Sequence, residues 1–184
     1  IVALLGKEVV PFHVANLGSG RESIGHRQLD AKTFSIPHVK DYLEISKKHF
    51  VMVDPKEREQ FIQMQIEIIE KEHNGKIISQ EKVMPQVIHL VEWPTLTVTS
   101  FNPDFLKTPK EVLISEMVEH QKYFPVAQEN GDLKNLFVIT SNTKPTDPIR
   151  AGNQRVLSAR LKDGVFLFEQ DLKIPLENFN GKLK

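Results

Sequence analysis

The groups best suited to chemistry gather in two stretches of this sequence. Gly25-His26-Arg27 places an imidazole beside a guanidinium, and Glu116, His120 and Lys122 follow one another within two helical turns. An acid, a base and a cation brought together in this way could hydrolyse an acyl ester with an activated water. His26, Glu116 and His120 are the set we predict for that reaction. The alternative interpretation is that Glu116, His120 and Lys122 are solvated surface groups.

A series of positive charges marks the last quarter of the sequence. Arg150, Arg155 and Arg160 lie five residues apart, with Lys162 close behind. Such a patch could hold phosphate groups. On a straight helix, however, successive arginines point about 140° away from each other. They share one face only if the helix breaks near Ser158-Ala159, so solvated and ion-paired surface roles stay open as an alternative.

The sequence lacks the residues that several other kinds of catalytic or binding site require. The chain has seven histidines and no cysteine, so thiol nucleophiles, disulfides and thiolate metal sites are excluded. No histidine pair has a metal-ligand spacing, and no serine elbow or nucleotide-binding glycine loop is present. Gly18-Ser19-Gly20 is interpreted as a hairpin tip rather than a phosphate cradle, because a strand-like run and not a helix follows it. We therefore expect no metal and no cofactor in this chain.

The composition is that of an ordinary globular protein. Of 184 residues, 40% are apolar and 26% charged, and 24 basic residues balance 24 acidic ones. Because the net charge is zero, a polyanion such as a nucleic acid would have to bind a local patch of basic residues. No apolar run is long enough for a membrane span. We expect one domain, with a sheet-containing core over 1–145 and a helical segment over 146–184 packed on it. The start at Ile1 and the Lys-Leu-Lys end suggest a piece of something larger.

The stretch with Glu116 and His120 is predicted to be a helix from Thr108 to Pro125. Thr108 suits the N-cap, and Glu111 suits the third position of a capping box. Pro125 is expected to end the helix. One inward face is formed by the apolar residues at helical spacing: Leu113, Ile114, Met117 and Val118.

Elsewhere strand patterns alternate with helix patterns. The predicted strands are within 1–27 and at 50–53, 76–78, 95–99, 126–127 and 136–140. The predicted helices are 36–48, 55–74, 81–92 and the region from 145 onward. The succession from 50 to 78 indicates a βαβ unit, and Asn130-Gly131 indicates a hairpin. The fold class is therefore α/β (α+β), with a mixed β-sheet flanked by helices.

Six motifs in series resemble the β subunit of bacterial glycyl-tRNA synthetase, in the order and spacing of that family. They cover most of the chain and are together highly specific. They are Gly25-His26-Arg27, Val91-Glu92-Trp93-Pro94, Pro109 to Ile114, Glu119 to Pro125, Gly152 to Leu161, and Phe168 to Lys173.

The resemblance implies part of a cytoplasmic α2β2 enzyme that joins glycine to tRNA-Gly using ATP. The ATP and Mg²⁺ would be used by the α subunit, whereas the β subunit would chiefly recognise tRNA. The fold would resemble the editing-type domain of the phenylalanyl-tRNA synthetase β subunit. An HD domain and the other β-subunit domains would be further partners. Near the acceptor arm of the tRNA, the candidates for phosphate contacts are Arg27, Lys122, Arg150, Arg155 and Arg160.

The sequence departs from the family pattern at Gln28, Gln154 and Ser158-Ala159. The last change predicts an unbroken helix through Arg155, which would disperse the arginines. We expect this chain alone to be non-catalytic, with two alternatives. One is an editing-type deacylase that uses the histidines, and the other is a spacer that docks the HD domain or the α subunit. Exposure of the apolar run Val165 to Phe168 would favour the spacer.

Overall fold

The computed structural model describes residues 1–175 and 177–178, and the chain divides into two compact units. The first comprises residues 1–64, 88–95 and 141–144, and the second comprises 65–87, 96–140 and the chain from 145 onward. The predicted division into a core over 1–145 and a helical segment over 146–184, within one domain, stays a prediction. Of the predicted segment 146–184, residues 176 and 179–184 lie outside the described residues.

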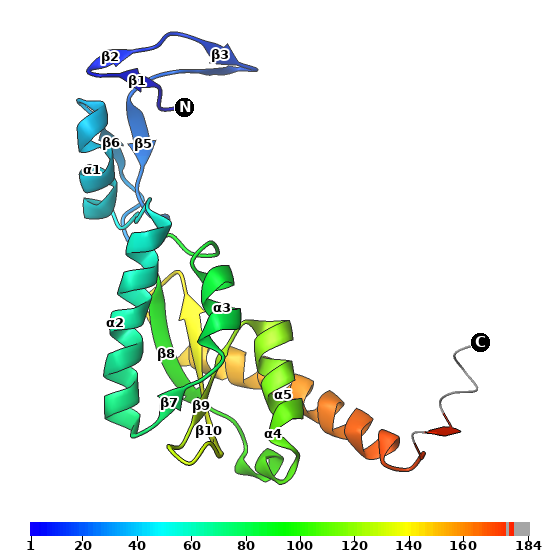
Figure 1. Ribbon diagram of the computed structural model, residues 1–184. Coiled ribbons are helices and arrows are strands. Elements are labelled where there is room, and N and C mark those ends of the chain that lie inside the picture. The colour runs from blue at the N-terminus through cyan, green and yellow to red at the C-terminus, as the bar shows by residue number, and fades with distance from the viewer. Residues whose placement is uncertain (176, 179–184) are drawn as a thin grey trace. The chain divides into compact units, whose positions relative to one another are not determined.

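Three short antiparallel hairpins open the first unit (Figure 1). They pair β1 (Leu4–Leu5) with β2 (Glu8–Val9), β3 (His13–Val14) with β4 (Leu17–Gly18), and β5 (Glu22–Ile24) with β6 (Thr33–Ser35). The strands predicted within 1–27 are confirmed, but the hairpin tip predicted at Gly18-Ser19-Gly20 is wrong. The chain turns instead between β3 and β4, where Ala15 has a φ of 51°. This left-handed conformation is usually taken by glycine, so the sequence pattern does not predict a turn at Ala15.

The helical part of the first unit begins with η1 (Val39–Asp41) and α1 (Tyr42–Lys48), as predicted for 36–48. The strand predicted at 50–53 is wrong. Phe50 has a φ of 61° directly after the C-cap of α1, a position that usually takes glycine. Met52 then donates its N–H to the Glu92 carbonyl at 2.9 Å outside any strand. Since this strand is missing, the βαβ unit is wrong as well.

Helix α2 (Pro55–His73) follows its predicted start and stop signals. The Asp54 carboxylate accepts the Lys56 N–H at 2.9 Å, and Asn74 ends the helix with a φ of 45°. The helix belongs to the first unit up to Met64 and to the second from Gln65.

The second unit contains a four-stranded sheet in the order β7-β9-β10-β8. Its strands are β7 (Lys76–Ile77), β8 (Thr95–Ser100), β9 (Phe124–Ala127) and β10 (Leu133–Ser141). β9 pairs antiparallel with both β7 and β10. Gly131, with a φ of 86°, lies in the predicted turn between β9 and β10. The class is thus confirmed as mixed α/β, with small antiparallel sheets instead of a βαβ arrangement.

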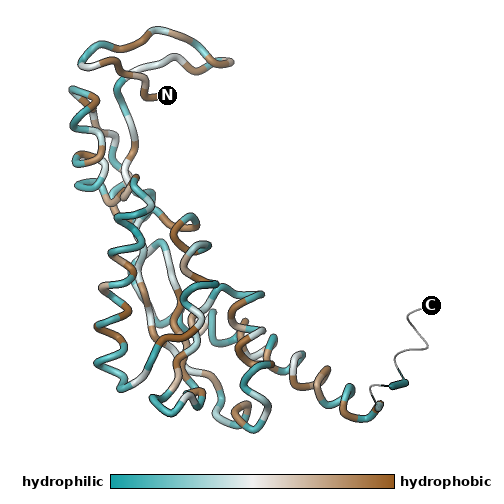
Figure 2. The backbone as a smooth tube through the Cα atoms, in the orientation of Figure 1, coloured by the Kyte–Doolittle hydropathy of each residue, from teal (hydrophilic) through white to brown (hydrophobic). Residues whose placement is uncertain are grey.

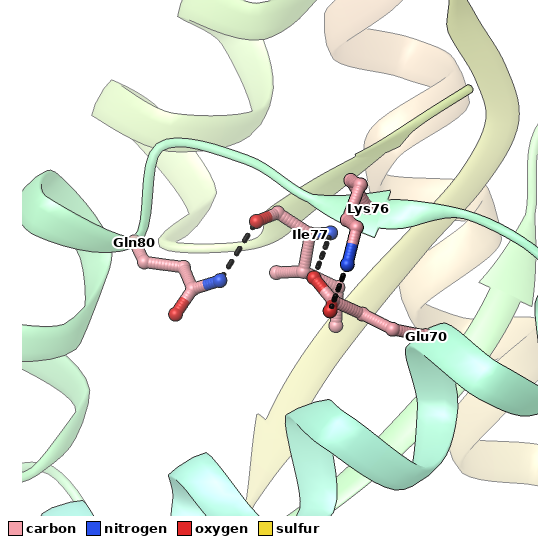
Figure 3. Close-up of polar contacts among 4 residues, drawn as sticks. All are labelled: Glu70, Lys76, Ile77 and Gln80. Carbon is pink, nitrogen blue, oxygen red and sulfur yellow. Dashed lines mark hydrogen bonds and ion pairs between the residues drawn. The ribbon is translucent and has the colours of Figure 1, made fainter. Parts of the chain in front are cut away.

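Glu70 ties α2 to the edge strand β7 (Figure 3). One carboxylate oxygen accepts the Ile77 N–H at 2.8 Å and the other lies 3.1 Å from the Lys76 ammonium. The Gln80 amide donates to the Ile77 carbonyl at 2.8 Å, at the start of α3 (Gln80–Val87). The helix predicted over 81–92 is therefore present but ends at Val87.

One face of the sheet is covered by α4 (Lys110–Ser115), the π-helix η3 (Glu116–His120) and α5 (Asp147–Asp171). A short 3-10 helix, η2 (Pro103–Lys107), precedes α4. Apolar residues recur through α4 and α5 (Figure 2). The buried cluster comprises Phe101, Leu113, Met117, Tyr123, Leu133, Phe137, Ile139, Leu157 and Leu161.

The helix predicted from Thr108 to Pro125 is correct in its inward face and wrong at both ends. Pro109 and not Thr108 is the N-cap, without a side-chain cap bond. After η3, the Tyr123 N–H donates to the Met117 carbonyl at 3.0 Å, and Lys122 takes a φ of 58°. This bond joins residues six apart, one more than in the Schellman motif of an α-helix, and it closes the end of the π-helix η3. Pro125 is then free to lie in β9, opposite Phe137.

Candidate nucleic-acid interface

Helix α5 positions the three arginines predicted to hold phosphate. Thr146 caps its start by accepting the Ile149 N–H at 3.4 Å, and Leu157, Leu161 and Gly164 form its buried side. The helix runs without a break through Ser158-Ala159. The expectation of an unbroken helix is confirmed, so the arginines do not form a single stripe.

The arginines of α5 differ in environment. Arg150 is partly buried, and its guanidinium lies 2.9 Å from the Asp147 carboxylate. Arg155 and Arg160 are exposed and on different sides of the helix. Arg155 shares its side with the exposed Lys162, because seven residues make nearly two turns. The widest cationic face on α5 is therefore the one with Arg155 and Lys162.

Lys122 is held close to its own backbone. Its ammonium donates to the Glu119 carbonyl, and the side chain is only partly exposed. The Glu119 carboxylate lies 3.6 Å from the Lys82 ammonium. The Lys122 ammonium therefore already donates a hydrogen bond within the chain, whereas no ion pair is found for Arg155 among the described residues.

Two further motifs meet through a hydrogen bond. The Tyr123 hydroxyl donates to the Asn153 side-chain oxygen at 2.6 Å, and the Asn153 amide donates to the Ile149 carbonyl at 2.8 Å. Burial raises the pKa of the Tyr123 phenol. This pair fixes the end of η3 against α5.

The three residues of the predicted hydrolytic set are divided between the units. Glu116 and His120 belong to the second unit, where His120 is exposed and Glu116 packs against α5. A Cβ at Gly164 would lie 3.1 Å from the Glu116 side chain, so the glycine permits this close packing. His26 belongs to the first unit and is buried. Neither unit by itself contains all three groups.

His26 is held in a tight turn of the first unit. The ring Nδ1 accepts the backbone N–H groups of Gln28 at 3.2 Å and Leu29 at 3.3 Å. The backbone N–H of His26 donates to the His49 carbonyl at 2.9 Å. A Cβ at Gly25 would come within 2.2 Å of the Asp30 carbonyl oxygen. Gly25 is therefore required for this turn.

The turn opens onto a cavity of about 720 Å³ within the first unit. The main polar groups of its lining are His26, Arg27, Gln28, Arg58, Glu92 and Asn142. Residues from two of the sequence motifs, 25–27 and 91–94, thus line the same cavity.

Arg58 and Asn142 build this cavity, and no sequence pattern pointed to either. The Arg58 guanidinium donates to the carbonyls of Ile88 at 2.6 Å, Val53 at 3.0 Å and also Met52. The Asn142 oxygen accepts the N–H groups of Glu92 at 2.8 Å and Trp93 at 3.0 Å. Their partners lie up to 50 residues away in the sequence, where local patterns carry no information.

Among the described residues there is no group of three or more His, Asp or Glu side chains suited to a metal ion. No helix in that part of the chain is long and apolar enough to cross a membrane.

All 184 residues match the family described as glycyl-tRNA synthetase beta subunit. The chain belongs to this family. It is 40% identical over 180 residues to the glycine–tRNA ligase beta subunit of Syntrophus aciditrophicus (strain SB), an alignment that covers 97% of this chain and 26% of the relative. The beta subunit of Citrifermentans bemidjiense is 42% identical over 179 residues, covering 96% of this chain and 26% of that relative.

A third relative has a different length. The glycine–tRNA ligase of Chlamydia muridarum (strain MoPn / Nigg) is 40% identical over 184 residues, which are 100% of this chain and 18% of that protein. The chain thus spans about a quarter of the beta-subunit relatives. The resemblance found in the six motifs is confirmed.

Proposed function

We propose that this chain is a tRNA-handling, non-catalytic part of a glycine–tRNA ligase β subunit. The observation that carries the proposal is the family match along all 184 residues. In the proposed enzyme, an α2β2 assembly in the cytoplasm, glycine activation with ATP and Mg²⁺ belongs to the α subunit. This chain then needs no cofactor of its own and works beside the remaining β-subunit domains, on a fold of the phenylalanyl-tRNA synthetase editing type.

The exposed cations of α5 support a contact with the acceptor arm of tRNA-Gly. Arg155 and Lys162 share one exposed side, and no ion pair joins either to another described residue. Phosphates favour such uncommitted cations, because no protein partner has to be displaced. Arg150 and Lys122 are weaker candidates since each already contacts an oxygen of the chain.

The test is binding of tRNA-Gly across a salt series, beside an unrelated tRNA. We expect affinity to fall steeply with salt, and the slope of log K against log salt to drop by about one for each phosphate contact that Arg155→Ala/Arg160→Ala removes. Lys71→Ala/Lys107→Ala is the matched control, because it also removes two exposed positive charges from the second unit. Equal slopes in both double variants would contradict a contact at α5. No binding at low salt would contradict tRNA handling by this chain.

A second candidate is a spacer that docks the HD domain or the α subunit. It is favoured by Phe166 and Leu167, which are 58% and 59% exposed near the end of α5. Aspartate at either position should weaken association with the α subunit or the rest of the β subunit, but leave tRNA binding by the isolated chain unchanged. This difference separates the spacer from the tRNA-handling function.

The deacylase alternative requires His26 of the first unit and Glu116 and His120 of the second. It predicts release of a mischarged amino acid from tRNA-Gly by the chain alone, and loss of that release in His120→Ala.

A further inference from the structure

The four-stranded sheet of the second unit has two edges, and they differ in their protection. At one edge, β7 has only two residues, one of them Lys76, and the Ile77 N–H is bonded to the Glu70 carboxylate (Figure 3). Short length, charge and a covering group are the usual protections of an edge strand. At the other edge, β8 has six residues, Thr-Leu-Thr-Val-Thr-Ser, without charge or proline. An uncharged edge rich in β-branched residues is a template for a further strand.

The hydrogen bonds around β8 show which of its backbone groups face outward. The Phe101 N–H, directly after the strand, donates to a carbonyl of β10 at 3.1 Å. Successive residues of a strand direct their N–H groups to opposite sides. The Leu96 N–H accordingly donates to the Gln65 side chain of α2 at 2.9 Å. By the same alternation the N–H groups of Val98 and Ser100 face outward. Both residues are partly exposed, and outside the sheet no hydrogen bond is found for either N–H among the described residues.

A groove of about 710 Å³ lies along this outward edge, within the second unit. All five residues from Leu96 to Ser100 line it, together with residues of α2 and α5. Because two helices form its walls, a second folded copy of the chain would bring its own α2 and α5 into the same space. The groove therefore suits a single extended backbone.

The charged groups of the groove favour a basic residue on the occupant. Glu72 of α2 lines the groove, is exposed and has no ion pair with a described residue. Asp147 and Arg150 of α5 also line it, and they pair with each other at 2.9 Å. The uncompensated charge of the lining is therefore negative. A lysine or arginine opposite Glu72 would pair with it.

We propose that β8 pairs with an extended segment of the same β subunit, outside residues 1–184, which adds a fifth strand and places a basic side chain opposite Glu72. Extended segments bind sheet edges through backbone hydrogen bonds, while side chains at alternate positions give specificity. The beta-subunit relatives contain ample further chain, since this chain aligns with only 26% of each. A segment of the same polypeptide also has a high effective concentration at the edge. The inference rests on the proposed place of this chain in a β subunit and is independent of tRNA binding.

The test compares amide hydrogen exchange, resolved by residue, in this chain and in the complete β subunit that contains it. The Phe101 N–H, which is bonded to β10, is the internal reference. We expect Val98 and Ser100 to exchange fast in the chain and about 100-fold more slowly in the complete subunit, because the added strand then protects them. Equally fast exchange in both proteins would overturn the inference.

Proline substitutions separate strand pairing from simple burial. Val98→Pro removes an outward N–H, which an edge strand without a partner tolerates. We expect this variant to leave the urea midpoint of the chain unchanged but to restore fast exchange of Ser100 in the complete subunit. The matched control Thr97→Pro removes an N–H directed at β10 and should lower the midpoint in both proteins. Slow exchange of Ser100 that persists in Val98→Pro would mean burial without pairing, and the inference would fall.

The charge of the occupant is tested at Glu72. Glu72→Lys should speed Ser100 exchange in the complete subunit about tenfold, because a favourable ion pair becomes a repulsion. Glu67→Lys is the matched control, an equal change of charge at an exposed residue of α2 outside the groove. Equal effects of the two variants would contradict the basic residue opposite Glu72.

The remaining outcomes identify a different occupant or a different failure. Slow exchange of Val98 and Ser100 in the chain alone, together with dimers in sedimentation, would make a second copy the occupant and overturn the proposal. Exchange is measured without tRNA, so loss of tRNA-Gly binding contradicts the proposed function and leaves this inference standing. Should Val98→Pro fail to fold by circular dichroism, the comparison of Glu72→Lys with Glu67→Lys decides.

Discussion

In the second unit, nine buried side chains, Phe137 among them, form one apolar cluster, whereas the hairpins of the first unit have strands of only two or three residues. The first unit instead relies on side chains that bind backbone: Arg58 holds three carbonyls and Asn142 holds two N–H groups. Five of the buried apolar residues lie in the first unit and twenty-one in the second. The second unit is thus organised by apolar burial, and the first by directional polar contacts.

Removing the centre of the cluster should have the largest effect. Phe137 is fully buried and its ring lies 5.1 Å from that of Tyr123. Phe137→Ala is expected to lower the free energy of unfolding by about 3–5 kcal/mol, because it leaves a large cavity. Urea unfolding followed by circular dichroism measures this, with the exposed Phe166→Ala as a control of the same chemistry.

The same variant tests whether the units unfold together. Trp93 lies in the first unit, so its fluorescence reports there while circular dichroism reports on the whole chain. The predicted single domain requires coincident transitions by both probes. If Phe137→Ala lowers the urea midpoint measured by circular dichroism but leaves the midpoint measured by Trp93 fluorescence unchanged, the single domain is contradicted.

The first unit should be most sensitive at Gly25. In Gly25→Ala the new Cβ meets the Asp30 carbonyl oxygen at 2.2 Å, and backbone must move. We expect a loss of about 1–3 kcal/mol, typical of overpacking, with a changed environment for the neighbouring His26 ring. Gly152→Ala is the control, since a Cβ there meets nothing within 4 Å. Equal stability of the two variants would contradict the tight turn.

A polar contact in the second unit should matter less than its apolar cluster. Glu70→Ala leaves the buried Ile77 N–H without its acceptor and should cost about 1–3 kcal/mol. Glu70→Gln keeps an oxygen for that N–H and removes only the ion pair with the mostly exposed Lys76, so it should cost under about 1 kcal/mol. The two variants are compared by urea unfolding. Similar losses would mean that the charge, and not the hydrogen bond, ties α2 to β7.

The smallest expected effect is a pH dependence at Tyr123. Burial raises the pKa of this phenol in the folded state above the value near 10 of an unfolded chain. Its contribution is complete below pH 10 and is lost as the pH rises through the folded pKa, because the unfolded state then releases the proton first. Tyr123→Phe should reduce the alkaline loss of stability and cost about 1 kcal/mol at neutral pH. An unchanged alkaline slope would contradict this role.

The elements that could be predicted are those with local signals. Asp54 and Asn74 mark the two ends of α2, and Asn130-Gly131 marks the β9–β10 hairpin. The errors arise where a residue takes an unusual conformation. Ala15, Phe50 and Lys122 have positive φ values without being glycine. Tertiary contacts stabilise these conformations, and a sequence pattern does not show them.

The candidate sites show the same limit. Arg155 and Arg160 can be placed on α5 from spacing alone, because a helix has a regular geometry. The cavity of the first unit could not be assembled in advance, since its walls come from four separate parts of the chain, around residues 26–28, 58, 89–92 and 142–143. Only folding shows that Asn142 meets the 91–94 motif.

The exposed apolar tips of the hairpins have a consequence for the protein as a colloid. Leu5, Val14 and Leu17 are 77%, 56% and 62% exposed. The chain has a formal net charge of zero and a sequence pI of about 7.2, so molecules repel one another least near neutral pH. The osmotic second virial coefficient should therefore be lowest near pH 7 and rise at pH 9, where net negative charge opposes contact between the tips. Concentrated solutions should therefore associate less at pH 9 than at pH 7.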